Sequence, residues 1–522
     1  MKYQFWGWQN VNVKPVTEEY KGINSPIDLY NALSTIWCAD TCAPRMRADW
    51  TRENKTLGQC SITAFLAQDI FGGKVYGVLR PGGNYHCFNV IGDCRFDLTS
   101  EQFGDEVLDY ENNPEQFREV HFAKEEKRLR YEYLKAELEN YCMAFDFDRE
   151  INRFNTHSLK WDFCGKEQLP LWVADSDFLV PPAVTKRLKD RIEHGLYGYY
   201  LEGNEIYDVL MNWFLEEYNV TIPKKDWIKL VPAIVPSLAV ASNIGGGKSI
   251  VCTPNYCGLL GAPLSAGNEL IKVPLKNENE HYSMDFDALE AAITEDTKIF
   301  YLCNPHNPVG RVYSMEELKQ VSAFAKKHHL LVVSDEVHCE IIFEGKHIPF
   351  FTVDDYAREH SITLYSNGKM YNVPDLILAF AVIPNQELRK EFERLGYAFG
   401  EEHVLNVEAG IATYAESGEW RKQLLVYLKN NRDYLEQQLK MRFPKAKVVH
   451  LEGTYLEWVD FRAYGNDVDA GFFKRKAKVF LSEGEIFGSD GYVRINFATR
   501  RKILEEALDR MERALSLSVA QA

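Results

Sequence analysis

The stretch LYSNGKMYNVP, residues 364–374, contains a lysine, Lys369, directly after a run with the composition of a β-strand. Ser366, Asn367 and Gly368 precede this lysine, and such small residues let the backbone turn sharply and a bulky ligand come close. A lysine presented in this way can form an imine with an aldehyde. Because most lysines that follow serine or glycine are ordinary surface groups, the interpretation depends on what the rest of the chain supplies.

Composition limits the class of protein and its partners. The chain has 522 residues, of which 46% are hydrophobic, so it can bury sizeable cores. Its formal net charge of −16 argues against nucleic acids and anionic membranes as partners. The first residues, MKYQFWGWQN, lack the apolar run of a signal peptide, and no stretch has the length of a membrane span. We therefore expect a cytoplasmic location and a small-molecule substrate.

The cysteines do not form a regular pattern. Eleven of them are scattered along the chain. Cys38 and Cys42 come nearest to a metal-binding pair, but no matching pair at zinc-finger spacing follows. We expect mostly reduced thiols and no metal site.

The chain divides into two regions of different character. Residues 1–122 are dense in tryptophan, cysteine and short runs punctuated by glycine. The charged stretch AKEEKRLRYEYLKAELEN that follows predicts a connecting helix over 123–142. From there to residue 522, strand-like and helix-like runs alternate, which is typical of a mainly parallel sheet covered by helices. The sequence therefore predicts a small first domain and a larger α/β region over 143–522.

The first domain contains a candidate set of catalytic side chains. In GQCSITAFLAQDIFGG, residues 58–73, Cys60 lies at the expected start of a helix, where a thiolate is stabilised. His86 follows in a strand-like run, and Asp97 is expected on the next strand. Papain-like and transglutaminase-like thiol enzymes present cysteine, histidine and aspartate in this order. The alternative is that Cys60 is merely a buried structural thiol.

Several further residues of this domain carry a resemblance to the small bacterial YunG family. The similarity covers nearly all of residues 25–105 and includes Trp37, Thr41, Trp50, the GQC run at Cys60, and His86. It implies a small α+β domain. It leaves open whether that domain is a thiol hydrolase or a binding or regulatory module.

The larger region contains residues suited to bind a phosphate and to stack on an aromatic ring. WIKLVPAIVPSLAVASNI, residues 227–244, predicts a strand, a turn and a helix, so that the N–H groups of Ala233 and Ile234 would face a phosphate. SIVCTPNY ends in Tyr256, an aromatic side chain placed to stack on a ring. Taken singly, each of these features is typical of ordinary turns and packing.

Polar residues also follow the next predicted strands. Asn307 lies in the turn of KIFYLCNPHNPVGRV, and the buried strand in HLLVVSDEVHCEIIF ends at Asp335, with His338 just beyond. Ligands of α/β sheets bind at the carboxyl ends of the strands. Together with Lys369, this order of features predicts one coherent cofactor site.

The same motifs make residues 143–518 resemble the fold-type I enzymes of pyridoxal 5′-phosphate (PLP), in the class I/II aminotransferase superfamily. Within it, the chain is most similar to the cystathionine β-lyase branch of MalY/PatB-type carbon–sulfur (C–S) lyases. The runs that carry this similarity include LPLWVADSDFLVPPAV, HGLYGYY, NPHNPVGRV, SDEVH, GKMYNVP, EGTYLEWVDFR and GYVRIN. The resemblance implies a large mainly parallel-sheet domain at about residues 190–420. A small α+β domain would combine residues 143–189 with 421–522.

The resemblance also implies roles for the residues around the cofactor. Lys369 would bind PLP through an imine and take the Cα proton of the substrate, while Asp335 would pair with the pyridine nitrogen. The other contacts would be Asn307 and His338 near the ring hydroxyl, Tyr256 on the ring face, and Ser366, Ala233 and Ile234 at the phosphate.

Two more residues extend the implied site. Arg494, in VRIN, would bind the α-carboxylate of an amino-acid substrate as a bidentate fork. Tyr199 would reach the phosphate bound by the neighbouring subunit, which implies a homodimer with shared active sites. Three positions depart from the family pattern, which usually has methionine at Ser176, glycine at Ala233, and serine or threonine at Gly368.

The activity expected from this resemblance is cleavage of cystathionine or another L-cysteine S-conjugate to a thiol, pyruvate and ammonia. One alternative is a PLP-dependent class I/II aminotransferase, because both reactions begin with removal of the Cα proton. Another is a bifunctional or regulatory fusion, in which the first domain is a thiol hydrolase or a binding module.

Overall fold

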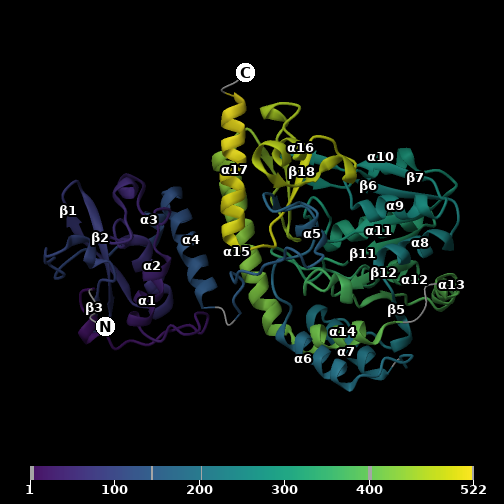
Figure 1. Cartoon of the computed structure of the whole chain (residues 1–522), viewed down its shortest axis with the longest axis horizontal. Coiled ribbons are helices and arrows are strands. Elements are labelled where there is room, and N and C mark those ends of the chain that lie inside the picture. Colours follow the sequence, from purple (N-terminus) through teal and green to yellow (C-terminus); the bar gives the residue numbers. More distant parts are fainter. Residues whose placement is uncertain (1–4, 143–144, 202, 398–401, 520–522) are drawn as a thin grey trace. The chain divides into compact units, whose positions relative to one another are not determined.

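The computed structural model describes residues 5–142, 145–201, 203–397 and 402–519. The chain divides into two compact units, Met1–Asp146 and Phe147–Ala522 (Figure 1). The expected start of the second region at residue 143 lies outside the described residues. None of the described helices is both long and apolar enough to cross a membrane.

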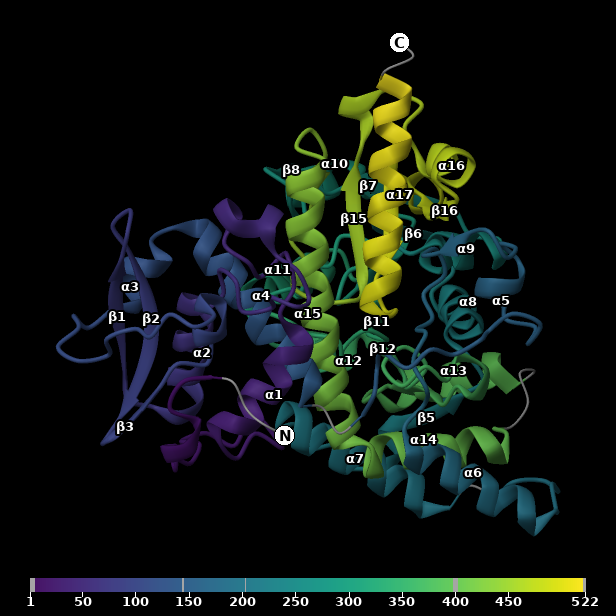
Figure 2. The ribbon, with the colours of Figure 1, turned by 60° about the vertical axis from the view of Figure 1, so that its left-hand side comes forward.

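The first unit packs helices against a small antiparallel sheet. Its helices are α1 (Pro26–Ile36), α2 (Cys60–Phe71), α3 (Arg118–Phe122) and α4 (Glu125–Tyr141), and its strands, in sheet order, are β1 (Lys74–Arg80), β2 (Asn84–Ile91) and β3 (Cys94–Phe96). Helix α2 contacts both β2 and α4 (Figure 2). Phe65 and Ile70 of α2 share one hydrophobic core with Leu134 and Leu138 of α4. The central helix of this unit is therefore the one that begins with Cys60.

The predicted elements around the cysteine differ from the structure at one point. The helix that starts at Cys60 and the strand that carries His86 are confirmed. The prediction that Asp97 lies on the next strand is wrong by one residue, because β3 ends at Phe96. The Asp97 side chain accepts a hydrogen bond from the backbone N–H of Thr99, 2.9 Å away, and this local turn ends the strand.

The second unit is built on a seven-stranded sheet, which confirms the expected α/β class. In spatial order the strands are β5 (Ile228–Val231), β13 (Ala379–Val382), β12 (Ser361–Ser366), β11 (Leu331–Asp335), β10 (Thr297–Cys303), β6 (Lys248–Thr253) and β7 (Leu270–Pro274). Strands β12, β11, β10, β6 and β7 pair in parallel, while β13 runs antiparallel to both of its neighbours. The strand ends that carry functional residues consequently meet at one edge.

Helices cover both faces of this sheet. One hydrophobic core joins Leu364 of β12 to α8 (Ile234–Ile244), α9 (Cys257–Ser265) and α13 (Gln386–Gly396). The next residue, Tyr365, belongs to a second core with α7 (Asn204–Tyr218) and α14 (Val404–Glu416). Successive side chains of a strand point to opposite faces, so β12 is buried on both sides and its end is rigidly positioned.

A four-stranded sheet completes the second unit. Its order is β14 (Lys447–Val448), β15 (Leu456–Asp460), β18 (Tyr492–Asn496) and β17 (Ser482–Glu483), all antiparallel. The long helices α15 (Gly418–Arg442) and α17 (Arg501–Val519) run beside it (Figure 1). Nearby, β4 (Leu169–Pro170) pairs with β16 (Val479–Phe480), and the chain then continues into residues 171–178.

Candidate active site

Lys369 lies in the turn directly after β12. Its Nζ donates a hydrogen bond to the carbonyl oxygen of Ala174, 2.9 Å away. Burial and the positive charge of Arg494 lower the pKa of Lys369, and the charges of Asp175 and Asp335 offset only part of this effect. The lowered pKa favours the neutral amine, which is the form that can act as a nucleophile or a base.

Asp335 lies at the end of β11 and is buried. Its Oδ1 accepts a hydrogen bond from the backbone N–H of Val337 at 3.2 Å. Burial raises the pKa of Asp335 to about 6, although this hydrogen bond and the charge of Lys369 lower it. A buried carboxylate whose ionisation is disfavoured gains most from a cationic partner, and a protonated pyridine nitrogen is such a partner.

Arg494 is buried in β18 and is held by neutral acceptors. It donates to Asn307 Oδ1 at 3.1 Å, to the carbonyl of Trp172 at 2.8 Å and to Ser482 Oγ at 3.3 Å. Within the described part of the chain, its Nε has no hydrogen-bond partner. Burial lowers the pKa of Arg494 to about 10. A guanidinium in this state is suited to an incoming carboxylate, which would supply both the charge and the missing acceptor.

His338 completes the cluster of buried titratable groups. Burial and the positive charges of Lys369 and Arg494 lower the pKa of His338 well below its usual value. Its Nδ1 is buried and has no hydrogen-bond partner among the described residues. The neutral ring packs edge-on against Tyr455, with ring centroids 5.8 Å apart. His338 therefore offers an unused polar atom inside the site.

The remaining predicted contacts surround the same edge of the sheet. Ser366 is buried at the end of β12, and its Oγ accepts the N–H of Gly368 at 2.9 Å. A Cβ at Gly368 would lie 3.1 Å from this oxygen, so the turn has little room for a larger residue. Ala233 is the N-cap of α8 and Ile234 its first residue, so backbone N–H groups are available there for an anion.

Tyr256 precedes α9 and is its N-cap. A Cβ at Gly258 would overlap the Tyr256 ring, so the glycine lets the aromatic side chain pack close to the helix. Burial raises the pKa of Tyr256, and the neutral phenol is therefore maintained.

The chemical groups that these residues present match those that PLP requires. Asp335 is a buried acid whose neighbours supply too little positive charge to offset its burial. The start of α8 and Ser366 provide hydrogen-bond donors for a phosphate. Lys369 provides the amine for covalent attachment. The unpaired atoms of His338 and Arg494 are positioned for polar groups that the chain itself does not supply.

Residues 169–184 carry one of the family motifs, but the sequence did not predict that their backbone carbonyls join these groups. The carbonyls of Trp172 and Ala174 accept from Arg494 and Lys369, and Tyr455 Oη also donates to Ala174, at 3.2 Å. Backbone carbonyls have no residue-specific signal. Tyr455 lies inside a quoted motif, EGTYLEWVDFR, but only the structure shows where its hydroxyl points.

Tyr199 does not join this site within the same chain. Its side chain is fully exposed, and Leu196, Tyr197 and Leu201 around it are exposed as well. The expectation that Tyr199 serves a neighbouring subunit stays a prediction.

The first unit brings together the three other predicted side chains. His86 Nε2 lies 2.6 Å from Asp97 Oδ2, and both residues are buried. Cys60 is half-buried, and its thiol lies beside the side chains of His86 and Cys87, both of which act on its pKa. The role of Cys87 was not foreseen, although it follows His86 directly in the sequence.

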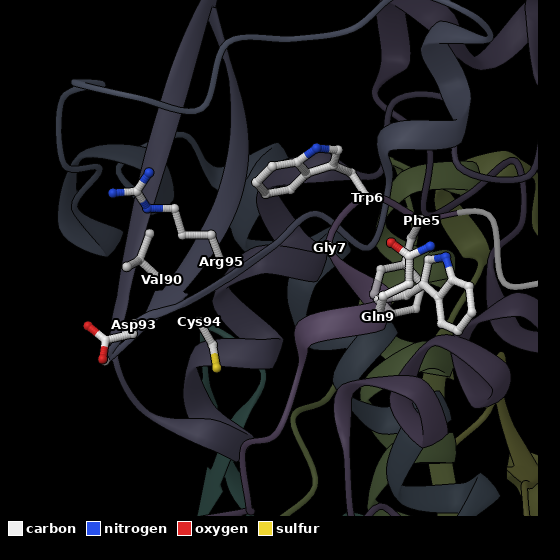
Figure 3. A pocket seen from close by; sticks show the side chains of 10 residues that line it. Phe5, Trp6, Gly7, Gln9, Val90, Asp93, Cys94 and Arg95 are labelled. Atoms are coloured by element: carbon white, nitrogen blue, oxygen red, sulfur yellow. The ribbon is translucent and has the colours of Figure 1, made fainter.

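A hollow of about 620 Å³ also lies in this unit, between residues 5–9 and the β2–β3 turn (Figure 3). Trp6 lines it, and the Trp6 ring stacks on Tyr110 with centroids 3.9 Å apart. Its lining residues do not include Cys60, His86 or Asp97, so it is separate from these three side chains.

Two family models match the chain. Residues 174–511 match the model described as aminotransferase class I and II. Residues 25–143 match the model described as YunG protein.

Known proteins are similar to the second unit over their whole length. Cystathionine beta-lyase PatB of Bacillus subtilis is 32% identical over 390 residues, which is 71% of this chain and 100% of PatB. The structure of cystalysin from Treponema denticola, which contains PLP, matches with a TM-score of 0.69 and 30% identity, over 72% of this chain and 100% of that one. The PLP-bound C-S lyase from Staphylococcus hominis matches with a TM-score of 0.68 and 30% identity, over 72% and 99%.

The raised pKa of Asp335 predicts that the free energy of unfolding of the cofactor-free protein depends on pH. The neutral acid is present at low pH, and the buried carboxylate becomes destabilising as pH rises from the usual value of 3.8 towards about 6. Above pH 6, we expect Asp335→Asn to be more stable than the wild type by about 3 kcal/mol, and this difference to vanish towards pH 4. Urea unfolding at several pH values measures it. Exposed Asp355→Asn is the control, and a difference independent of pH would contradict the prediction.

Proposed function

The chain belongs to the aminotransferase class I and II family, and we propose that its second unit is a PLP-dependent C–S β-lyase. The substrate would be cystathionine or another L-cysteine S-conjugate, and the products a thiol, pyruvate and ammonia. Support comes from relatives that are named cystathionine beta-lyase or C-S lyase and match over their full length.

The observation that carries the proposal is the shared anchoring of Lys369 and Arg494. Both donate to carbonyls of one short segment, at Ala174 and Trp172. The lysine whose place on PLP the substrate amine would take and the group that binds the substrate carboxylate are therefore held close together, as an α-amino acid requires.

The residues around PLP would divide the work of holding it. Asp335 would pair with the ring nitrogen, Tyr256 would stack on the ring, and Asn307 and His338 would lie near its hydroxyl. Ser366, Ala233 and Ile234 would bind the phosphate. When bound, PLP draws electrons away from the substrate Cα, so that its proton becomes acidic and a thiolate can leave from Cβ.

The chain's own residues move the proton and fix the substrate. Lys369 Nζ, whose lowered pKa favours the neutral amine, takes the proton from Cα and can return it to the departing sulfur. Arg494 binds the α-carboxylate and so fixes the orientation of the Cα–H bond relative to Lys369. Because these groups lie in a buried site, their charges act with little screening by water.

We further propose a homodimer in which Tyr199 reaches the neighbouring subunit's phosphate. The exposed apolar side chains at Leu196, Tyr197 and Leu201 support a partner that covers them.

We also propose how the second unit divides into domains. A large domain at about residues 190–420 would hold the seven-stranded sheet, and a small domain of 143–189 plus 421–522 would hold the four-stranded one. A cytoplasmic location is supported by eleven free cysteines.

A lyase and an aminotransferase differ in what they consume. We expect the protein with PLP to release pyruvate and ammonia from L-cystathionine without any added 2-oxo acid. Lys369→Ala should lose the PLP absorbance near the visible edge and reduce pyruvate release by about 10³-fold or more. Exposed Lys390→Ala serves as the control. A requirement for a stoichiometric 2-oxo acid would favour the aminotransferase instead.

Arg494→Lys tests recognition of the carboxylate. Lysine keeps the charge but loses the two parallel N–H groups, so kcat/KM for L-cystathionine should fall by about 10²-fold while PLP absorbance is retained. The rate with the cysteamine S-conjugate, which has no carboxylate, should change little. Equal losses with both substrates would show that Arg494 does not bind the carboxylate.

Tyr199→Phe tests the shared site. We expect the wild type to be a dimer by light scattering, and the variant to remain dimeric but to release PLP more readily during dialysis, because one phosphate donor is lost. Tyr197→Phe is the matched control, since its hydroxyl bonds to Ile192 in the same chain. A monomeric wild type that retains PLP would overturn this part of the proposal.

A further inference from the structure

The first unit holds a thiol, an imidazole and a carboxylate that have no role in the PLP site. Cys60 is the first residue of α2, His86 lies on β2, and Asp97 follows β3. The three elements belong to one packed unit, so the arrangement of these side chains does not depend on the second unit.

Asp97 is fixed by hydrogen bonds to both of its oxygens. Oδ1 accepts from the backbone N–H and hydroxyl of Thr99, at 2.9 and 3.1 Å. Oδ2 accepts from Tyr110 Oη at 2.8 Å and lies 2.6 Å from His86 Nε2. The ring of Phe103 packs edge-on against His86, with centroids 4.6 Å apart. His86 Nε2 is thus committed to Asp97, which leaves Nδ1 for Cys60.

The Cys60 sulfur lies beside several hydrogen-bond donors. It interacts with the side chains of His86 and Cys87 and with the backbone N–H of Cys87, and Cys60 is half-buried. The hydrogen bond from Cys87 and the charge of His86 lower the pKa of Cys60 well below that of a free thiol, despite burial. The interaction with Cys60 and burial raise the pKa of Cys87 well above that of a free thiol, so Cys87 stays a protonated donor.

The charges around the sulfur favour a thiolate–imidazolium pair. Although burial alone would lower it, Asp97 and Cys60 raise the pKa of His86 to about 10. His121 of α3 and Lys127 of α4 also act on Cys60, and Lys127 Nζ lies 3.1 Å from His121 Nδ1. Burial lowers the pKa of His121 to about 4, so this ring is neutral, while Lys127 adds positive charge.

Helix α2 supplies the last requirement of an acyl-transfer site. Its N-cap residue, Gln59, makes no side-chain capping bond. The N–H groups of the first turn therefore remain available beside the sulfur. Such N–H groups can stabilise the negative charge that develops on a carbonyl oxygen when a thiolate attacks the carbon.

We propose that Cys60, His86 and Asp97 form a second catalytic site, which hydrolyses an amide or ester through an acyl group on Cys60. The thiolate attacks the carbonyl carbon, and a C–S bond forms. The C–N or C–O bond then breaks as His86 gives its proton to the leaving nitrogen or oxygen. Neutral His86 next takes a proton from water, the hydroxide attacks the thioester carbon, and the acid is released with the Cys60 thiolate and protonated His86 restored.

The first test compares two half-buried thiols in the full-length protein. Burial raises the pKa of Cys142 to about 11. Alkylation by iodoacetamide, followed peptide by peptide by mass spectrometry, should therefore be at least about ten times faster at Cys60 than at Cys142 at pH 6 to 7. His86→Gln should remove most of this advantage. Equal rates at the two thiols would overturn the proposal.

The second test separates acyl transfer from mere thiol reactivity. With p-nitrophenyl acetate as the probe, we expect an acetyl group on Cys60 and continued release of nitrophenol beyond one equivalent per chain. Cys60→Ser should reduce this release by about 10²-fold, and His86→Gln should leave the acetyl group trapped on Cys60. Pyruvate release by the second unit should be unchanged in both variants, so the two activities fail separately.

Two outcomes would contradict this assignment. Acetylation of Cys60 no faster than that of Cys142 would exclude an acyl-transfer site. Formation of a Cys60–Cys87 disulfide with peroxide, together with nitrophenol release that Cys60→Ser does not reduce, would identify a redox pair of thiols instead.

Discussion

Four consecutive carbonyl groups, at residues 172–175, are the constraint on which the PLP site depends. Trp172 accepts from Arg494, Val173 and Asp175 accept from Asn496, and Ala174 accepts from Lys369. Arg494 and Asn496 belong to β18 of the smaller sheet, whereas Lys369 follows β12 of the larger one. This extended segment therefore ties the two sheets together, and it fixes the distance between an amine and a guanidinium that are far apart in the sequence.

The electrostatic design of the site is a consequence of this convergence. Lys369, Arg494 and His338 are brought together in a buried space, where Asp175 and Asp335 are the acids that act on Lys369. Burial disfavours each cationic form, and neighbouring cations add to this effect at Lys369 and His338. Anionic ligands such as a phosphate or a carboxylate would stabilise the cationic forms. Burying these charged groups without a ligand costs free energy, so the site is suited to bind anions.

The two units make a nucleophile by opposite means. At Lys369, burial and a neighbouring cation disfavour the charged form and so favour the neutral amine. Cys60 becomes charged because hydrogen-bond donors and a neighbouring cation stabilise the thiolate against burial. In both cases a positive neighbour, Arg494 or His86, favours the deprotonated form. Burial therefore favours the deprotonated form of Lys369 but opposes that of Cys60.

The sequence by itself determined the elements and the order of the polar residues at their ends. The strand before Asp335, the turn at Lys369 and the helices that begin at Ile234 and Cys60 could all be predicted, because hydrophobic period and small turn residues are local signals. The strand end before Asp97 was misplaced by one residue, since a side-chain turn with Thr99 ends it.

Only the tertiary structure decided which of these residues meet. The contact of Arg494 with Asn307 spans 187 residues, and the anchoring carbonyls of Trp172 and Ala174 are backbone groups that every residue possesses. The donor role of Cys87 likewise depends on how β2 packs against α2. Hydrogen bonds to backbone atoms and contacts between distant elements leave no pattern in one sequence, so packing alone turns separate motifs into a site.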